Sequence, residues 1–176
     1  VALAERLTDH LAAPHPDAPR ERLWKVRARA VVLATGAIER PLVFSDNDRP
    51  GVMLASAASA WVNRYGVKPG ERALVVTRED SGYAAAFALH AAGVEVAAIA
   101  DTRIFPKEAG ERARAAGLPV IASATLLGTE RRRRITEAQL GFVTRSGQVR
   151  AGEAVPCDCL VMAGGWTPSL HLSSQS

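Results

Sequence analysis

The stretch RALVVTREDSGYAAAFALHAAGVEVAAIAD, residues 72–101, decides the fold. The short apolar run over residues 73–77 predicts a strand, and an alanine-rich helix is predicted over residues 81–92, where Gly93 ends it. A second strand is predicted over residues 94–100. A strand, a helix and a strand in this order predict parallel pairing through a right-handed crossover.

The same alternation continues on the C-terminal side of this stretch. A helix is predicted over residues 106–116 and a third strand over residues 119–122. Residues 124–151 lose the helical period and predict a small antiparallel meander, and residues 158–163 predict a last buried strand that ends at Gly164. The predicted class is therefore α/β, a Rossmann-like parallel sheet with helices on both faces and the meander beside it.

A helix and a buried strand are predicted on the N-terminal side. Apolar residues recur at helical spacing over residues 54–65, and Gly66 stands where a helix C-terminal glycine belongs. Residues 30–34 are apolar at every position, which predicts a buried parallel strand. Alternating apolar and basic residues over 23–28 predict a half-exposed strand, and residues 1–7 have an extended pattern.

Composition and charge exclude several classes of protein. With 176 residues, 48% of them hydrophobic, the chain is long enough for one core and a small appendage. No apolar run approaches the roughly 18 residues of a membrane span, and Val1 begins no secretion signal, so we expect a cytoplasmic protein with no membrane partner. Cys157 and Cys159 are interpreted as reduced core thiols.

The net charge of +4 owes much to the four arginines at positions 131–134. A tight basic cluster before an extended segment is interpreted as a solvated hairpin tip. Because no aromatic residues are interleaved and no recognition motif lies beside the cluster, we expect no nucleic-acid partner.

The first candidate for binding a nucleotide is the end of the strand predicted over residues 30–34. Ligands of open parallel sheets bind at the carboxyl ends of strands, and this strand runs into Thr35, Gly36 and Ala37. A glycine at such a point lets the backbone approach a cofactor closely. An ordinary strand end with a tight turn explains the same residues and stays open as an alternative.

The second candidate is the turn that follows residues 73–77. When G-x-G-x-x-G is laid over it, the glycine positions fall on Thr77, Glu79 and Gly82, of which only Gly82 conforms. Gly82 preserves close packing of helix on strand, whereas Glu79 puts a side chain where a diphosphate would lie. We interpret the turn as a dinucleotide-type fold whose phosphate cradle is weakened or lost.

Asp101 ends the second predicted strand, 19 residues after Gly82. An acidic residue at this point binds the ribose hydroxyls of an NAD-type ligand, but Asp at a strand end is also a common turn former, and both interpretations stay open. No catalytic group or metal site is predicted, because the histidines are scattered without metal-ligand spacing. The histidines are His10, His15, His90 and His171.

Several motifs resemble those of a known family. The segments ATGAIERP (34–41) and DNDRPGV (46–52) resemble the flavin-domain exit and crossover of flavoproteins with two dinucleotide-binding domains. With NRYGV (63–67), GGWTP (164–168) and the closing HLSSQS (171–176), the chain is similar to the alpha subunits of heterotetrameric sarcosine oxidases. The degenerate glycine pattern of the second turn is a feature that this family shares.

The resemblance implies a fragment of a larger protein in which one domain is split in sequence. Residues 1–40 would be the C-terminal part of the split FAD- or NAD-binding domain. Residues 41–164 would form an inserted NAD(P)-binding-like Rossmann domain, and residues 165–176 would return to the first domain.

The resemblance also implies cofactors and partners. The alpha subunit would be associated with NAD, and the whole enzyme, with its other subunits, would use FAD and FMN to demethylate sarcosine oxidatively to glycine. Thr35, Gly36 and Ala37 would line the NAD pocket. The predicted set of cofactor-binding residues is completed by Gly82, Asp101, Gly164 and Gly165. The fragment alone is expected to be inactive, and a fragment that binds no cofactor stays open.

Two other interpretations stay open. The chain could belong to a related amine or amino-acid dehydrogenase, such as an opine or cyanide-forming glycine-oxidising enzyme, because the substrate would bind elsewhere in the complex. It could also be a ligand-free Rossmann-like module that serves subunit assembly. In isolation, an apolar sheet edge beside residues 31–34 would favour self-association.

Overall fold

The structure, a computed structural model, describes residues 1–131, 133–144 and 146–175. Two residues named above, Arg132 in the arginine cluster and Ser176 in the closing motif, lie outside the described residues. No helix among the described residues is long and apolar enough to cross a lipid bilayer.

The chain forms two compact units. One consists of residues 1–35 and 170–176, and the other of residues 36–169. The division into a split domain and an inserted domain, with boundaries near residues 40 and 164, stays a prediction.

A five-stranded parallel sheet forms the centre of the larger unit. Its strands, in spatial order, are β4 (Val52–Leu54), β11 (Cys159–Ala163), β5 (Arg72–Thr77), β6 (Glu95–Asp101) and β7 (Val120–Ala122). All neighbouring pairs are parallel. The strands predicted in the alternating stretch, and the last buried strand, are confirmed.

Three predicted helices are confirmed between these strands. They are α1 (Ala55–Tyr65), α2 (Asp80–Ala91) and α3 (Lys107–Ala115). Gly66 ends α1 in the left-handed conformation, with φ of 64°, and its N–H donates to the carbonyl of Trp61. The buried face of the helices packs on Val75, Ile99 and Val161 of the sheet, which form the centre of one apolar core.

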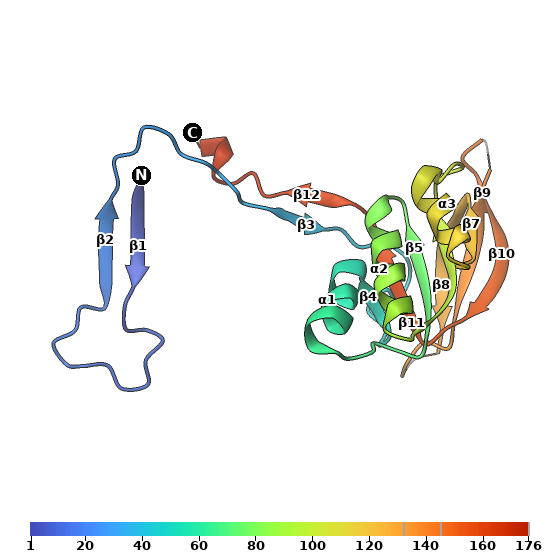
Figure 1. The fold of residues 1–176 in the computed structure, drawn as a ribbon, viewed down its shortest axis with the longest axis horizontal. Coiled ribbons are helices and arrows are strands. Elements are labelled where there is room, and N and C mark those ends of the chain that lie inside the picture. The colour runs from blue at the N-terminus through green and yellow to red at the C-terminus, as the bar shows by residue number, and fades with distance from the viewer. Residues whose placement is uncertain (132, 145, 176) are drawn as a thin grey trace. The chain divides into compact units, whose positions relative to one another are not determined.

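The α/β class is confirmed, but the helices lie on one face of the sheet rather than on both. The chain passes through β4, β5, β6 and β7 in one direction across the sheet, and right-handed crossovers made in one direction lie on one side. Only the return to β11, between β4 and β5, runs the other way. Figure 1 shows α1 and α2 on one side of the sheet and β8–β10 on the other.

The second face of the parallel sheet is covered by an antiparallel sheet, which confirms the predicted meander. Its strands are β8 (Ala124–Glu130), β9 (Glu137–Val143) and β10 (Val149–Pro156). Leu126 and Leu140 of the meander pack with Leu74 and Leu160 of the parallel sheet in a second apolar core. The segment between β7 and β11, which contains β8–β10, therefore buries the face of the parallel sheet that the helices leave uncovered.

A two-stranded ribbon completes the larger unit. β3 (Ala37–Glu39) pairs with β12 (Trp166–Pro168) in antiparallel register, Glu39 opposite Trp166 and Ala37 opposite Pro168. The ribbon joins the first and the last residues of the unit. Its residues are exposed except Glu39, which is 6% exposed.

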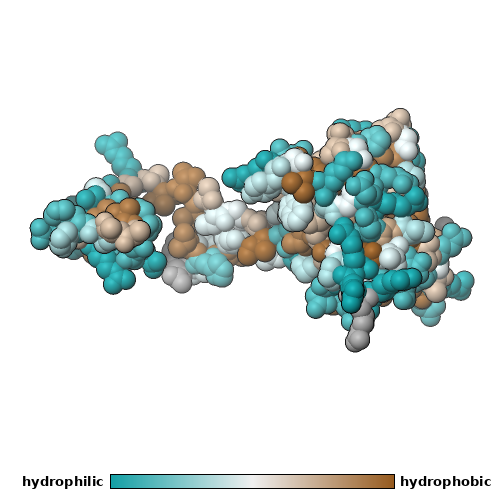
Figure 2. Space-filling model, turned by 90° about the horizontal axis from the view of Figure 1, so that it is seen from below, coloured by the Kyte–Doolittle hydropathy of each residue, from teal (hydrophilic) through white to brown (hydrophobic). Residues whose placement is uncertain are grey.

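The smaller unit holds a hairpin of β1 (Ala2–Arg6) and β2 (Glu21–Lys25), which confirms the extended segments predicted near the N-terminus, and the short helix η1 (Ser173–Gln175). The buried strand predicted over residues 30–34 is wrong, because all of these residues are described outside any strand and Val32 is 90% exposed. An apolar run forms a buried strand only where neighbouring strands supply hydrogen-bond partners. In this unit β1 and β2 pair with each other instead of with residues 30–34. Apolar side chains thus reach the surface, as Figure 2 shows in brown.

Candidate functional site

The turn between β5 and α2 is closed by the side chain of Thr77. This residue is fully buried, and its hydroxyl donates to the carbonyl of Glu79 at 2.6 Å and accepts from the N–H of Glu79 at 3.1 Å. In a phosphate-binding turn, such N–H groups point at the ligand. Here the N–H of Glu79 is used within the protein.

Gly82 leaves room for Thr77 rather than for a ligand. A Cβ atom on Gly82 would lie 2.4 Å from Cβ of Thr77 and 2.5 Å from its Oγ1. Glu79 places a carboxylate in the middle of the turn, where it accepts a hydrogen bond from the hydroxyl of Ser81 at 2.6 Å. An N–H that is already paired with Thr77 and a carboxylate on the same residue do not fit a diphosphate, which agrees with the interpretation of a weakened or lost cradle.

Asp101, at the end of β6, is buried and engaged by protein donors. It is 0% exposed and accepts from the hydroxyl of Tyr83 at 2.8 Å and from the guanidinium of Arg103 at 2.8 Å. Its other oxygen accepts from the N–H of Arg103 at 2.9 Å. Arg103 also pairs with Asp80, the first residue of α2, at 2.8 Å. A ribose would have to displace these donors, and a cofactor-binding role of Asp101 stays a prediction.

The two side chains that donate to Asp101, Tyr83 and Arg103, have raised pKa values. Burial raises the pKa of Tyr83, and the hydrogen bond to Asp101 adds to the rise. The hydrogen bond to Asp101 also raises the pKa of Arg103. Both groups therefore stay protonated at physiological pH, and the cluster is suited to holding the end of β6 against α2 rather than to transferring protons.

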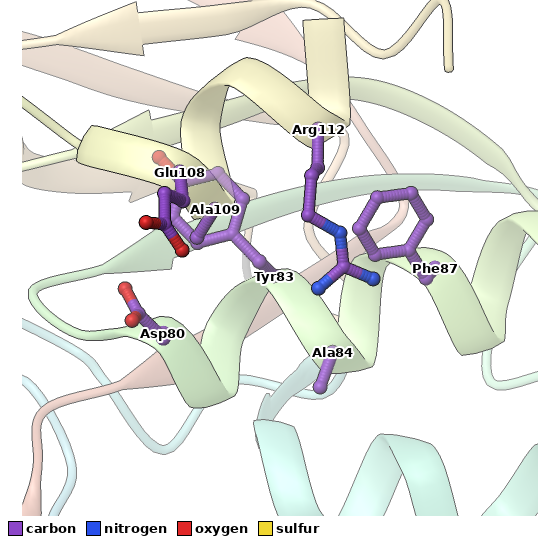
Figure 3. A pocket seen from close by; sticks show the side chains of 7 residues that line it. All are labelled: Asp80, Tyr83, Ala84, Phe87, Glu108, Ala109 and Arg112. Atoms are coloured by element: carbon purple, nitrogen blue, oxygen red, sulfur yellow. The ribbon is translucent and has the colours of Figure 1, made fainter. Parts of the chain in front are cut away.

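A pocket of about 210 Å³ lies between α2 and α3 (Figure 3). The guanidinium of Arg112 lies 5.9 Å from the ring centroid of Phe87, in a cation–π contact at one end of the pocket. The carboxylates of Asp80 and Glu108 stand in the first turns of the two helices, where negative charge stabilises the helix dipole. These local roles account for the charged lining without a ligand.

Gly164 and Gly165 let two segments of chain cross at the end of β11. The N–H of Gly164 donates to the carbonyl of Arg40 at 3.0 Å, and the N–H of Arg40 donates to the carbonyl of Gly165 at 2.8 Å. A Cβ atom on Gly164 would lie 2.6 Å from the carbonyl oxygen of Arg40. Both glycines thus have a packing role here, and their cofactor-binding role stays a prediction.

Glu39 is a residue of this region that the sequence pattern does not single out. It is 6% exposed, and its Oε2 accepts the N–H of Ser56, the second residue of α1, at 2.9 Å. Helix α1 has no acidic residue in its first turn, and Leu54 at its N-cap makes no side-chain hydrogen bond. Glu39 therefore caps α1 from the ribbon. A helix start without a capping residue is the signal that could have pointed to a distant cap.

Thr35, Gly36 and Ala37 lie where the two units divide. Thr35 belongs to the smaller unit, whereas Gly36 and Ala37 belong to the larger one. Gly36 has φ of 70°, and its carbonyl accepts the N–H of Ser169 at 3.0 Å. All three predicted residues are exposed.

Two groups of predicted site residues lie close together. Thr77, which packs on Gly82, stands opposite Asp101 in the pairing of β5 with β6. Gly164 and Gly165 contact Arg40, which directly follows β3. The two groups are neighbours along the carboxyl ends of β11, β5 and β6, because Thr77 also pairs with Ala163, the residue before Gly164.

Cys157 and Cys159 are buried thiols, and we expect both to be unreactive in the folded protein. Burial raises the pKa of Cys157 to about 11 and that of Cys159 to about 12, and the carboxylate of Asp158 adds to both shifts. At pH 8, a thiol reagent such as Ellman's reagent should label them only after unfolding, since the thiolate is the nucleophile. Rapid labelling of the native protein would contradict this expectation.

The same shifts predict how stability depends on pH. The raised pKa values mean that the unfolded thiols ionise first, near their ordinary pKa of 9.0. The contribution of the two thiols to the free energy of unfolding should therefore be constant below that pH and fall above it, by up to about 1.4 kcal/mol per pH unit for each thiol. Urea unfolding between pH 8 and 10.5 measures this slope, and Cys159→Ala should make it shallower.

Two curated proteins are similar to the chain over nearly all of its length. The chain is 42% identical over 169 residues to "Sarcosine oxidase subunit alpha" of Rhizobium meliloti (strain 1021), which covers 96% of the chain and 16% of that protein. It is 41% identical over 181 residues to the protein of the same name from Corynebacterium sp. (strain P-1), with 99% and 18% covered. The chain thus spans less than a fifth of the length of these relatives. No family model matches it.

Solved structures of two oxidoreductases share the fold. Thioredoxin reductase of T. acidophilum superposes with a TM-score of 0.60 and 14% identity, over 80% of this chain and 45% of that one. L-Proline dehydrogenase of P. horikoshii superposes with a TM-score of 0.50 and 21% identity, over 88% of this chain and 24% of that one. At these identities the likeness shows the fold alone.

Proposed function

Because the chain is related over nearly its whole length to the alpha subunits of sarcosine oxidases, we propose that it is a nucleotide-domain segment of the alpha subunit of a flavin-dependent amine oxidase. The observation that carries this proposal is the 42% identity over 169 residues to one such subunit. In the complete assembly, FAD and FMN take the electrons of sarcosine, which is demethylated to glycine. Other subunits of the oxidase are the proposed partners.

NAD is the nucleotide that we propose for this subunit, bound near the ribbon rather than at the α2 turn. At the α2 turn the N–H of Glu79 is paired with Thr77, and Glu79 adds a negative charge. At Gly36, by contrast, no atom of the described residues beyond its chain neighbours lies within 4 Å of the position of a Cβ atom, and Gly36 is exposed, so the backbone there is open to a ligand. Thr35, Gly36 and Ala37 are the residues proposed to line the NAD site. When bound, NAD supplies a hydride-accepting nicotinamide ring.

A ligand-free assembly module is the second candidate. It is favoured by the α2 turn, where the N–H of Glu79 donates to Thr77 and the carboxylate of Glu79 adds a negative charge, and by Asp101, whose oxygens accept from Tyr83 and Arg103. On this proposal the larger unit keeps a Rossmann-like shape only to contact other subunits. Nucleotide binding by the chain separates the two candidates.

Titration of the 176-residue chain with NAD+, followed by calorimetry, is the first test. We expect saturable binding, weakened about tenfold by Gly36→Val, because φ of 70° and the close approach of a ligand both exclude a branched side chain. Glu79→Gly is the matched control at the other turn and should leave the affinity unchanged. Tighter binding by Glu79→Gly would move the site to the α2 turn, and no binding at all would favour the assembly module.

The substrate class is tested on the complete subunit assembly, since this chain holds no proposed catalytic residue. Oxygen uptake is compared with sarcosine, other N-alkyl amino acids and opines as substrates. A highest rate with sarcosine supports the proposal. A higher rate with an opine, or oxidation of glycine with release of cyanide, would assign the subunit to a related dehydrogenase.

A further inference from the structure

One oxygen of the Glu39 carboxylate has no hydrogen-bond partner among the described residues. Oε2 accepts the N–H of Ser56 at 2.9 Å, whereas Oε1 is buried and unpaired. Leaving a buried polar atom unpaired costs about 1 to 3 kcal/mol, and more for a charged group, so native proteins rarely do so without a reason. Oε1 therefore needs a hydrogen-bond donor, and the described residues do not supply one.

Glu39 contacts the N-terminal turn of α1, the end of a helix at which N–H groups lack partners within the helix. The first N–H groups of a helix have no partner within it, and of those in α1 Glu39 takes the one on Ser56. Leu54 adds no side-chain cap, and no acidic residue stands in the first turn. The side chain of Ser56 is exposed, so this end of the helix can be reached from solvent.

We propose that Glu39 and the first turn of α1 bind the amide edge of a ring cofactor, an edge on which a carbonyl stands next to an N–H group. The carbonyl accepts a helix N–H, and the N–H donates to Oε1 of Glu39. A modest rotation of the carboxylate brings Oε1 toward the ligand while Ser56 keeps a partner. Glu39, Ser56 and α1 all belong to the larger unit.

The carboxamide of nicotinamide is the source of this edge that follows from the proposed function, on which the inference rests. The imide edge of a flavin ring presents the same pair of groups. Neither source requires the α2 turn, which does not fit a diphosphate. A ligand with a carboxylate in place of the amide would instead meet Glu39 with like charge.

The test compares NAD+ with nicotinic acid adenine dinucleotide, which differs from it only in a carboxylate for the carboxamide, on the full chain. Calorimetry should show that the wild-type protein binds NAD+ at least tenfold more tightly. In Glu39→Gln the amide oxygen can still cap α1 while its NH2 group replaces Oε1, so the preference should disappear or reverse. Ser56→Ala keeps the backbone N–H and is the matched control, with the wild-type preference. Thermal melts establish that each variant folds.

Riboflavin and N3-methylriboflavin, which lacks the imide N–H, form the flavin arm of the same experiment. A Glu39-dependent preference for either amide-bearing compound supports the inference and identifies the source of the edge. If NAD+ binds but neither pair is discriminated, or if Glu39→Gln keeps the preference, the inference is overturned and the proposed function stands. If no nucleotide or flavin binds the chain, the inference and the proposed NAD site are overturned together, and the assembly module is favoured.

Discussion

Replacing Gly82 by alanine is expected to lower the free energy of unfolding by about 3 kcal/mol, although alanine favours helices over glycine by about 1 kcal/mol. Gly82 is the third residue of α2, and a Cβ atom there would lie 2.4 Å from Cβ of Thr77. Thr77 is fully buried and held by two hydrogen bonds to Glu79, so it cannot move aside. Urea unfolding followed by circular dichroism measures the loss.

A double-mutant cycle separates the steric clash from other effects. Thr77→Gly removes the atom that the new methyl group would strike, so Gly82→Ala should be neutral or slightly stabilising in that background. Gly128→Ala is the matched control, because in the described part of the chain no atom beyond its neighbours lies within 4 Å of its Cβ position, and its φ is not positive. A loss that is the same in the wild-type and in the Thr77→Gly background would refute the steric explanation. The cycle thus measures directly how tightly helix and strand are packed at this turn.

The substitution Asp101→Asn is expected to cost about 3 kcal/mol, since removing one partner of a buried ion pair leaves the other uncompensated. Asp101 is 0% exposed and accepts from Tyr83 and Arg103, each at 2.8 Å. The side chain of Arg103 is 30% exposed and keeps its contact with Asp80, so the cost should fall at the lower end of the range for buried pairs. Urea unfolding at pH 7 gives the value.

Tyr83→Phe is the control for Asp101→Asn. It removes one neutral donor and keeps the ion pair, so we expect a loss of only about 1 kcal/mol. Similar losses for the two variants would mean that the ion pair adds little beyond the tyrosine hydrogen bond. An Asp101→Asn variant as stable as the wild type would show that water or another side chain takes over the role of the carboxylate.

The order of elements from β5 to β7 could be predicted from the sequence because each is a local pattern. An apolar run, an alanine-rich helix and a glycine stop lie within a few residues of one another, and the crossover rule then orients the strands. The side of the sheet that the helices cover depends on where β11 inserts, which is a long-range pairing. The same reason explains the error over residues 30–34, where an apolar run says nothing about its partner strands.

The sequence predicts which residues form the candidate turn but not which contacts they make. The sequence shows the departure from the glycine pattern at Thr77 and Glu79. That the hydroxyl of Thr77 closes the turn is seen only in the structure. For Asp101 the sequence left a ribose contact and a turn open, and the network with Tyr83 and Arg103 adds a third role. Glu39 caps α1 although it lies 17 residues before Ser56 in the sequence, and no local sequence pattern indicates this contact.

The position of β11 has a consequence for the way the chain folds. β11 is made after β4, β5, β6 and β7, yet it lies between β4 and β5. During synthesis, β5, β6 and β7 can associate early, because they follow one another closely along the chain. The partner strand of β4 is β11, which is complete only when residue 163 has been synthesised. The high contact order of this insertion makes it the slow step, and until then β4 and the edge of β5 are unprotected against aggregation.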